Sequence, residues 1–224
     1  DAIRPSAPRN PPLLWCTVVE WMEQTIRTVS WMHQKGFAHR DLKTANMLLD
    51  HKELARARVK IGDFGLAQPL ADEKGQNHTT TKTTTSSGGT LGYMSPELRG
   101  GEIARGNNAA LKECDVWALG VIILEMLTTE RAHDWDDQRA PRLDNRYTDF
   151  TQVALAPSST WKDSAARAAF QLAKAMLQPS KQRPKMAEVL QSVHYKRLLA
   201  ERLRASMTQS GVNIDDHDEH VIGI

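Results

Sequence analysis

The chain has 224 residues, a quarter of them charged, and its formal net charge at pH 7 is only +2. A chain of this length can bury one sizeable core, so the composition predicts a soluble globular domain. Lysine and arginine are spread along the whole sequence, which argues against a nucleic-acid surface.

The chain opens with a proline-rich lead-in, residues 1–13, which we expect to be weakly ordered because proline removes a backbone donor and fixes φ. From Cys16 to Lys35 apolar residues recur at spacings of three and four, which predicts one amphipathic helix that Gly36 ends. The predicted buried face of this helix consists of Val19, Met22, Ile26, Val29 and Met32.

A β-hairpin is predicted next, because residues 46–50 (NMLLD) and 57–65 (ARVKIGDFG) flank the polar turn HKELAR. A long loop rich in threonine, serine and glycine follows, from Leu66 to Gly89. The sequence between the predicted helix and this loop is therefore compact and strand-like.

The sequence pattern of the second half of the chain predicts helices. Residues 116–127 form an apolar run that we interpret as a buried helix, with Asp115 as its N-cap. Further helices are predicted within residues 164–178 and 184–199. Residues 201–224 show no amphipathic period and are expected to be a loose tail.

The segment HRDLKTAN, residues 39–46, fills without a mismatch the pattern His-Arg-Asp-Leu, three residues, Asn, which is the catalytic-loop pattern of protein kinases. DFG at 63–65, SPE at 95–97, the apolar run after Asp115 and QRP at 182–184 then follow in the order of that family. A single such motif is weak, but five in order are specific.

The chain therefore resembles the C-terminal lobe of a eukaryotic protein kinase over residues 14–200, with the catalytic loop at 38–49 and the activation segment at 63–97. The resemblance implies a mainly α fold with a short β-hairpin at the catalytic loop and without the N-terminal β-rich lobe. HRDLKTAN, IGDFGLAQ and GYMSPE are also similar to the corresponding segments of NIMA-related kinases.

The resemblance implies a serine/threonine protein kinase that uses ATP and Mg²⁺. Asp41 would orient the substrate hydroxyl and accept its proton, and Lys43 would place its ammonium against the transferred phosphoryl group. Asn46 and Asp63 would supply oxygen ligands to Mg²⁺ beside the nucleotide. Lys43 together with Thr90 is typical of serine/threonine-directed members. Any one of these residues alone would more often be an ordinary loop residue.

Other residues have structural roles by the same resemblance. Glu97 and Arg183 would form an ion pair between the end of the activation segment and the late helices. Asp115 would brace the catalytic loop around His39, in addition to its role as an N-cap. These assignments concern architecture and not the reaction itself.

A phosphorylation switch is also predicted. Ser86 and Ser87 precede Thr90 at positions where related kinases carry an activating phosphate, and Arg40 is placed to pair with it. An upstream kinase would add this phosphate. The alternative is that the threonine-rich stretch is only a soluble connector.

Before His39 the only glycine is Gly36, so a glycine-rich phosphate loop is not present upstream, nor is a candidate for the lysine and glutamate that accompany it. Two alternative functions are consistent with this sequence. The chain is either a truncated kinase catalytic domain, inactive alone, or a noncatalytic kinase-like module that binds partners through its helical lobe. The complete catalytic loop and DFG favour the first.

The expected partner is a protein substrate with a serine or threonine acceptor, and neither nucleic acid nor a membrane. The run 116–127 is shorter than the roughly 20 residues of a membrane span. Cys16 and Cys114 are too few for a disulfide framework or a thiolate zinc site, which indicates reduced thiols. We therefore expect a cytoplasmic or nuclear protein.

Overall fold

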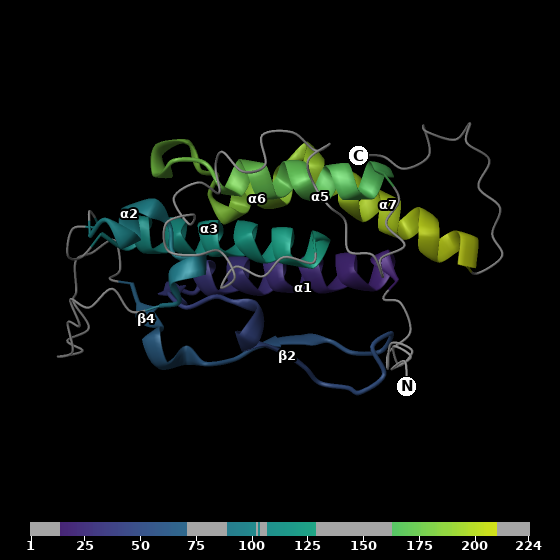
Figure 1. The fold of residues 1–224 in the computed structure, drawn as a ribbon, viewed down its shortest axis with the longest axis horizontal. Coiled ribbons are helices and arrows are strands. Elements are labelled where there is room, and N and C mark those ends of the chain that lie inside the picture. The colour runs from purple at the N-terminus through teal and green to yellow at the C-terminus, as the bar shows by residue number, and fades with distance from the viewer. Residues whose placement is uncertain (1–13, 71–88, 102, 104–106, 129–162, 210–224) are drawn as a thin grey trace, which may run out of the picture.

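The computed structural model describes residues 14–70, 89–101, 103, 107–128 and 163–209. Long helices lie side by side, and short strands run along one side of them beneath α1 (Figure 1). The mainly α fold that the sequence predicts is confirmed for the described residues. None of the helices in these ranges is long and apolar enough to span a lipid bilayer.

Helix α1, Trp15–Gln34, confirms the predicted amphipathic helix, and all five residues of its predicted apolar face are buried. The helix ends where Gly36 adopts a φ of 77°, a left-handed conformation that is easy only for glycine. This turn directs the chain into strand β1, Phe37–Ala38, and then into the catalytic-loop motif.

The predicted hairpin is present. Strand β2, Met47–Leu49, pairs antiparallel with β3, Val59–Ile61, with Met47 opposite Ile61. A second antiparallel pair, β1 with β4 (Gln68–Pro69), was not predicted, because two-residue strands are too short to show a periodic pattern. The two pairs hold both ends of the segment that contains DFG.

The hydrophobic core is centred on helix α3, Asn108–Leu127, which packs against α1 and α5 (Asp163–Met176). Helix α3 begins well before the apolar run, and the side chain of Asn107 accepts a hydrogen bond from the amide of Ala110 at 3.1 Å. Asn107 is therefore the N-cap, and the prediction of Asp115 as N-cap is wrong. Asp115 lies inside the helix.

Gly120 allows α3 and α5 to approach closely. A Cβ atom at this position would lie 2.9 Å from the Cβ of Met176 and 3.2 Å from the carbonyl oxygen of Ala173. We expect Gly120→Ala to lower the free energy of unfolding by about 1–3 kcal/mol, although alanine favours a helix by up to ~1 kcal/mol over glycine. Urea unfolding followed by circular dichroism measures this, and an unchanged midpoint would show that the helices can separate without cost.

The C-terminal helices differ from the prediction in two ways. Residues 184–199 contain two helices, α6 (Met186–Gln191) and α7 (Val193–Gln209), because Ser192 is extended and its hydroxyl oxygen accepts from the amide of Tyr195. Helix α7 continues to Gln209, so the predicted loose tail is wrong for residues 201–209. Arg202 forms an ion pair with Glu23 of α1 at 2.9 Å, a contact that the local sequence does not reveal.

Candidate active site

The catalytic loop is braced by Asp115 of α3, whose side chain is almost fully buried. One carboxylate oxygen accepts from the backbone amide of His39 and the other from the amide of Arg40, both at 2.8 Å. The imidazole Nε2 of His33 lies 2.9 Å from the first oxygen. Arg40 has a φ of 71°, which is unfavourable for a non-glycine residue, so Asp115 holds a strained backbone in place.

His39 connects the catalytic loop to the DFG segment. Its Nδ1 accepts from the amide of Asp41 at 3.3 Å, so the ring proton is on Nε2, which donates to the carbonyl oxygen of Gly62 at 3.1 Å. The ring centroid also lies 5.1 Å from that of Phe64. The fully buried His39 thus fixes the residue next to Asp63 relative to Asp41.

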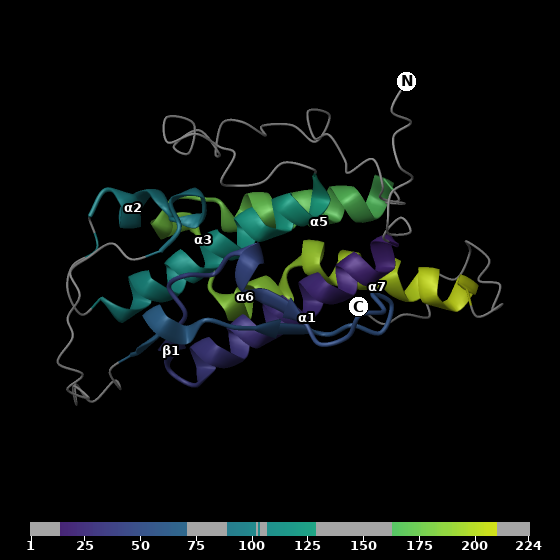
Figure 2. The ribbon, with the colours of Figure 1, turned by 60° about the horizontal axis from the view of Figure 1, so that its bottom comes forward.

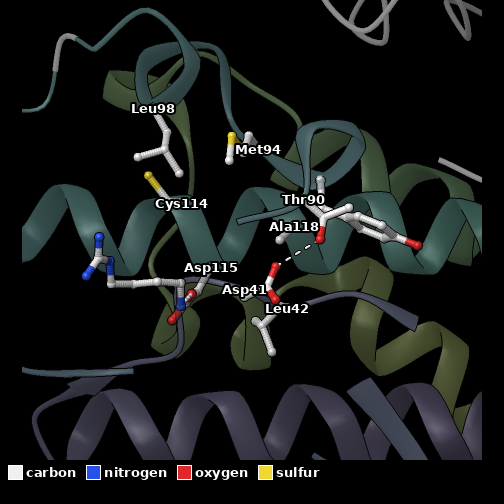
Figure 3. Close-up of a pocket in the computed structure, with 10 residues that line it drawn as sticks. Asp41, Leu42, Thr90, Met94, Leu98, Cys114, Asp115 and Ala118 are labelled. Carbon is white, nitrogen blue, oxygen red and sulfur yellow. Dashed lines mark hydrogen bonds between the residues drawn. The ribbon is translucent and has the colours of Figure 1, made fainter. Parts of the chain in front are cut away.

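The side chain of Asp41 is oriented by two groups. Thr90 Oγ1 donates to one carboxylate oxygen at 3.1 Å, and Lys43 Nζ lies 2.7 Å from the other. Lys43 also donates to Thr90 at 3.0 Å, and the side-chain amide of Asn46 donates to the backbone carbonyl of Asp41 at 2.8 Å. The carboxylate of Asp41 and Thr90 face each other across the site (Figure 3).

Asn46 and Asp63 lie at the same end of the β2–β3 hairpin, since one precedes β2 and the other follows β3. The amide of Gly62 donates to the backbone oxygen of Asn46 at 2.9 Å. Asp63 is exposed, has a φ of 58° and accepts weakly from the amide of Gly65 at 3.3 Å. One carboxylate and one amide oxygen suit Mg²⁺, which usually binds one or two protein oxygens together with water and phosphate.

Within the described ranges no group of three or more His, Cys, Asp or Glu residues could hold a metal by itself. Asn46 and Asp63 offer two oxygens, which could hold Mg²⁺ only together with water or phosphate oxygens.

The cavity behind the catalytic loop is about 10 Å³ in volume, enough for one water molecule at most. Figure 3 shows side chains from the catalytic loop, the segment after Gly89 and α3 converging on it. A larger cavity of about 650 Å³ lies between the ends of α1, α3 and α6 and is not lined by Asp41.

The ion pair predicted between Glu97 and Arg183 is present, with 2.6 Å between Oε1 and Nη1. Arg183 also donates to the backbone oxygens of Glu113 and Gln178, and its guanidinium lies 5.0 Å from the centroid of the Trp117 ring. Burial raises the pKa of Glu97, but the hydrogen bond and charge of Arg183, together with hydrogen bonds from the Glu97 backbone amide and from Ser95, outweigh burial, and the net pKa is lowered. Glu97 follows Pro96 in helix α2, Pro96–Arg99, so this pair ties that helix to α3 and the late turn.

Tyr93 and Cys114 are buried near the site. The hydroxyl of Tyr93 donates to Glu125 at 2.6 Å and lies 2.9 Å from the hydroxyl of Thr44. Burial raises the pKa of Tyr93, and the bond to Glu125 raises it further. Burial also raises the pKa of the Cys114 thiol to about 12, so this thiol is an inert packing group and not a nucleophile.

The predicted regulatory residues are only partly described. Ser86 and Ser87 lie outside the described residues. Thr90 contacts Asp41 and Lys43, as above, and the guanidinium of Arg40 donates to the side chain of Gln68 at 3.1 Å. The structure thus brings Arg40 to the β4 side of the site, and its pairing with a phosphate stays a prediction.

Several residues of the site were missed by the sequence analysis. His33 contacts Asp115, and two side chains of α1, Trp21 and Gln24, bind the backbone of the hairpin. The helical period marks His33 as buried, since it continues the stripe that includes Val29, but it does not identify the partner. These contacts join positions far apart in the chain.

Comparison with known proteins supports the same family. The family model described as "Protein kinase domain" matches residues 9–195. Serine/threonine-protein kinase Nek9 of Xenopus laevis is 37% identical over 118 residues, which are 53% of this chain and 11% of that protein. The interferon-induced, double-stranded RNA-activated protein kinase of Rattus norvegicus is 41% identical over 111 residues, 49% of this chain and 18% of that protein.

A longer match is to wall-associated receptor kinase-like 20 of Arabidopsis thaliana, 30% identical over 199 residues, 82% of this chain and 29% of that protein. The Nek9 match confirms the similarity to NIMA-related kinases, and kinases of other groups match at comparable identity. The chain spans only 11% to 29% of the length of these three relatives.

Proposed function

The chain belongs to the protein kinase domain family, and from this premise we propose that residues 14–200 form the C-terminal lobe of a serine/threonine protein kinase catalytic domain. The reaction would transfer the γ-phosphate of ATP to a serine or threonine hydroxyl of a protein substrate. The observation that carries the proposal is the network in which Thr90 and Lys43 orient the carboxylate of Asp41.

Asp41 would accept the proton of the substrate hydroxyl. An ionised carboxylate can only accept, and the donors Thr90 and Lys43 each occupy one oxygen, so the side chain has a single defined orientation. Because phosphoryl transfer depends mainly on positioning and charge neutralisation, this fixed orientation is the contribution expected from the catalytic loop.

Asn46 and Asp63 would hold Mg²⁺ against the phosphates of ATP, and Lys43 would face the transferred phosphoryl group. When bound, the metal supplies neutralisation of phosphate charge. The chain's own residues determine where that charge is placed, since His39 and the hydrogen bond from Gly62 to Asn46 fix both ligands relative to Asp41.

Specificity for serine and threonine is supported by the contact between Lys43 and Thr90 at 3.0 Å and by the similarity to serine/threonine-protein kinases such as Nek9. An activating phosphate at Ser86 or Ser87, added by an upstream kinase, would find the guanidinium of Arg40 nearby. The bond from Arg40 to Gln68 supports this, since it directs the guanidinium toward the segment that follows DFG.

The 224 residues as printed hold no glycine-rich loop before His39, and we propose that they do not transfer phosphate efficiently by themselves. Leu48, Phe64 and Leu91, all near the site, are each more than half exposed, which supports a further structural unit or ligand covering them. In an open, wet site each electrostatic contact with the transition state is weakened.

A radiolabelled phosphate-transfer assay with Mg²⁺ on the purified 224-residue chain tests this, with Asp63→Ala as the control for a contaminating kinase. We expect no transfer that depends on Asp63. Robust Asp63-dependent transfer would show that these residues suffice. Conversely, if the full-length gene product also shows no Asp41-dependent transfer, the noncatalytic partner-binding function is the better one.

A further inference from the structure

Strand β3 is attached to helix α1 by two side chains one helical turn apart. The indole Nε1 of Trp21 donates to the backbone oxygen of Ala57 at 2.9 Å, and Oε1 of Gln24 accepts from the backbone amide of Val59 at 2.7 Å. Arg58, between them, turns its backbone groups the other way and bonds to Asp50. The backbone groups of alternate residues, Ala57 and Val59, therefore face α1, because successive residues of an extended chain direct their backbone groups to opposite edges.

These hydrogen bonds fix the position of β3 along α1, which the hydrophobic contacts do not. Ile61 packs against the core and Val59 is buried, but apolar contacts are non-directional and allow a strand to slide along a helix. Hydrogen bonds have a narrow range of distances and angles. Trp21 and Gln24 therefore define the register of β3 on α1, along which the hairpin extends in both views (Figures 1 and 2).

The register of β3 determines where the proposed metal ligands lie. Asp63 follows the end of β3, and Asn46 precedes its partner strand β2. Asp41, in contrast, is held from α3 through Asp115. Direct bonds from His39 and Asn46 join the two parts of the site, and α1 adds a second hold on the hairpin alone. A hairpin that shifts on α1 should therefore move the proposed metal ligands while the catalytic loop stays in place.

We infer that Trp21 and Gln24 are positioning residues that set the metal-binding end of the hairpin relative to Asp41. This role rests on the proposed function, because it matters only if Asn46 and Asp63 bind a magnesium–nucleotide complex. Neither side chain would touch the reacting atoms.

Trp21→Phe and Gln24→Met each remove one hydrogen bond to the hairpin, and both substitutions of Gln24 also remove its exposed bond to Glu20. Trp21→Phe keeps an aromatic ring but loses the donor, Gln24→Met keeps the length but loses the acceptor, and Gln24→Glu retains an acceptor oxygen. Matched controls on the same helix are Trp31→Phe, at a residue 58% exposed, and Gln34→Met, whose amide bonds only within α1 to Ser30.

Two readouts are taken on the full-length gene product. Amide hydrogen exchange of residues 57–65 should show lost protection in Trp21→Phe and Gln24→Met, and near-native protection in Gln24→Glu and in both controls. The Mg²⁺ concentration for half-maximal phosphate transfer should rise about tenfold in the first two variants, the lower end of the range for residues that support metal ligands, with turnover at saturating Mg²⁺ nearly unchanged.

Unchanged protection of residues 57–65 in Gln24→Met would overturn the inference, whether or not the protein transfers phosphate. Lost protection with an unchanged Mg²⁺ requirement would also overturn it, since the contacts would then be only structural. An equal loss of protection and an equal rise in the Mg²⁺ requirement in the Trp31 and Gln34 controls would assign the change to α1 in general. That result would also overturn the inference. A wild-type protein with no Mg²⁺-dependent transfer would instead refute the proposed function, and the exchange data would separate the two cases.

Discussion

Asp41→Asn is expected to lower the rate of phosphate transfer by the full-length gene product roughly 10²- to 10⁴-fold, with folding and nucleotide binding retained. Asparagine has the same shape and keeps one oxygen that Thr90 or Lys43 can bind, so the local structure is preserved. Its amide cannot accept the proton of the substrate hydroxyl. Steady-state kinetics, combined with thermal unfolding and nucleotide titration, measure each of these outcomes.

Two comparisons make the Asp41 result specific. Asp50→Asn makes the same chemical change on an exposed part of the hairpin, where Asp50 pairs with Lys60, and should leave turnover within about twofold, in line with surface substitutions. Asp63→Ala should instead weaken magnesium–nucleotide binding, because it removes the anionic ligand. Normal turnover in Asp41→Asn would refute the role of this residue.

Arg183→Met is expected to lower the free energy of unfolding by about 3–5 kcal/mol, because it leaves the half-buried carboxylate of Glu97 without its partner. The backbone oxygens of Glu113 and Gln178 lose a donor in the same variant. Methionine keeps most of the apolar volume against Trp117, so the effect reports mainly on charge and hydrogen bonding. Denaturant unfolding measures it, and a loss below about 1 kcal/mol would contradict a buried role.

The double variant Glu97→Gln with Arg183→Met should be more stable than Arg183→Met alone, since no unpaired charge remains. The pH dependence has a defined sign. In the wild type the pKa of Glu97 is lowered from its ordinary value of 4.5, so its contribution to stability is present above pH 4.5 and is lost as the pH falls through the lower folded value.

In Arg183→Met the hydrogen bond and the charge of Arg183 no longer oppose burial, and only the hydrogen bonds from the backbone amide of Glu97 and from Ser95 still lower its pKa. The pKa of Glu97 is therefore higher than in the wild type, and its carboxylate contributes less to stability at neutral pH. The difference in stability between the two proteins should therefore be largest at neutral pH and shrink on acidification. Unfolding curves collected from pH 7 to pH 4 test this, and a constant difference would exclude Glu97 as the cause.

The sequence predicted correctly those parts of the fold that depend on the periodicity or spacing of neighbouring residues. The helical period identified the buried face of α1, and the change to a strand-like pattern around a polar turn identified the β2–β3 hairpin. The fixed spacing of the catalytic-loop motif placed Asp41, Lys43 and Asn46 together. Their chemical roles stay predictions until the variants are measured.

The errors have a common physical cause, which is that tertiary contacts outweigh local signals. An acidic residue just before an apolar run resembles an N-cap, yet Asn107 caps α3, and Asp115 lies inside the helix with its carboxylate bound to amides of the catalytic loop. Residues 201–209 look polar and unstructured, yet α7 extends through them and Arg202 binds α1. Likewise, nothing near Gln24 in the sequence indicates that it binds the backbone of Val59.

The way in which Asp115 holds the catalytic loop also determines how the geometry of this loop responds to ionic strength. Two of its hydrogen-bond partners are backbone amides, which are dipoles and not mobile ions, and its side chain is only 1% exposed. Dissolved salt screens exposed pairs such as Arg56 with Glu53, but it reaches a buried carboxylate very little. The geometry of the catalytic loop should therefore be the same in dilute buffer and in concentrated salt, even where surface ion pairs and the attraction of charged substrates are weakened.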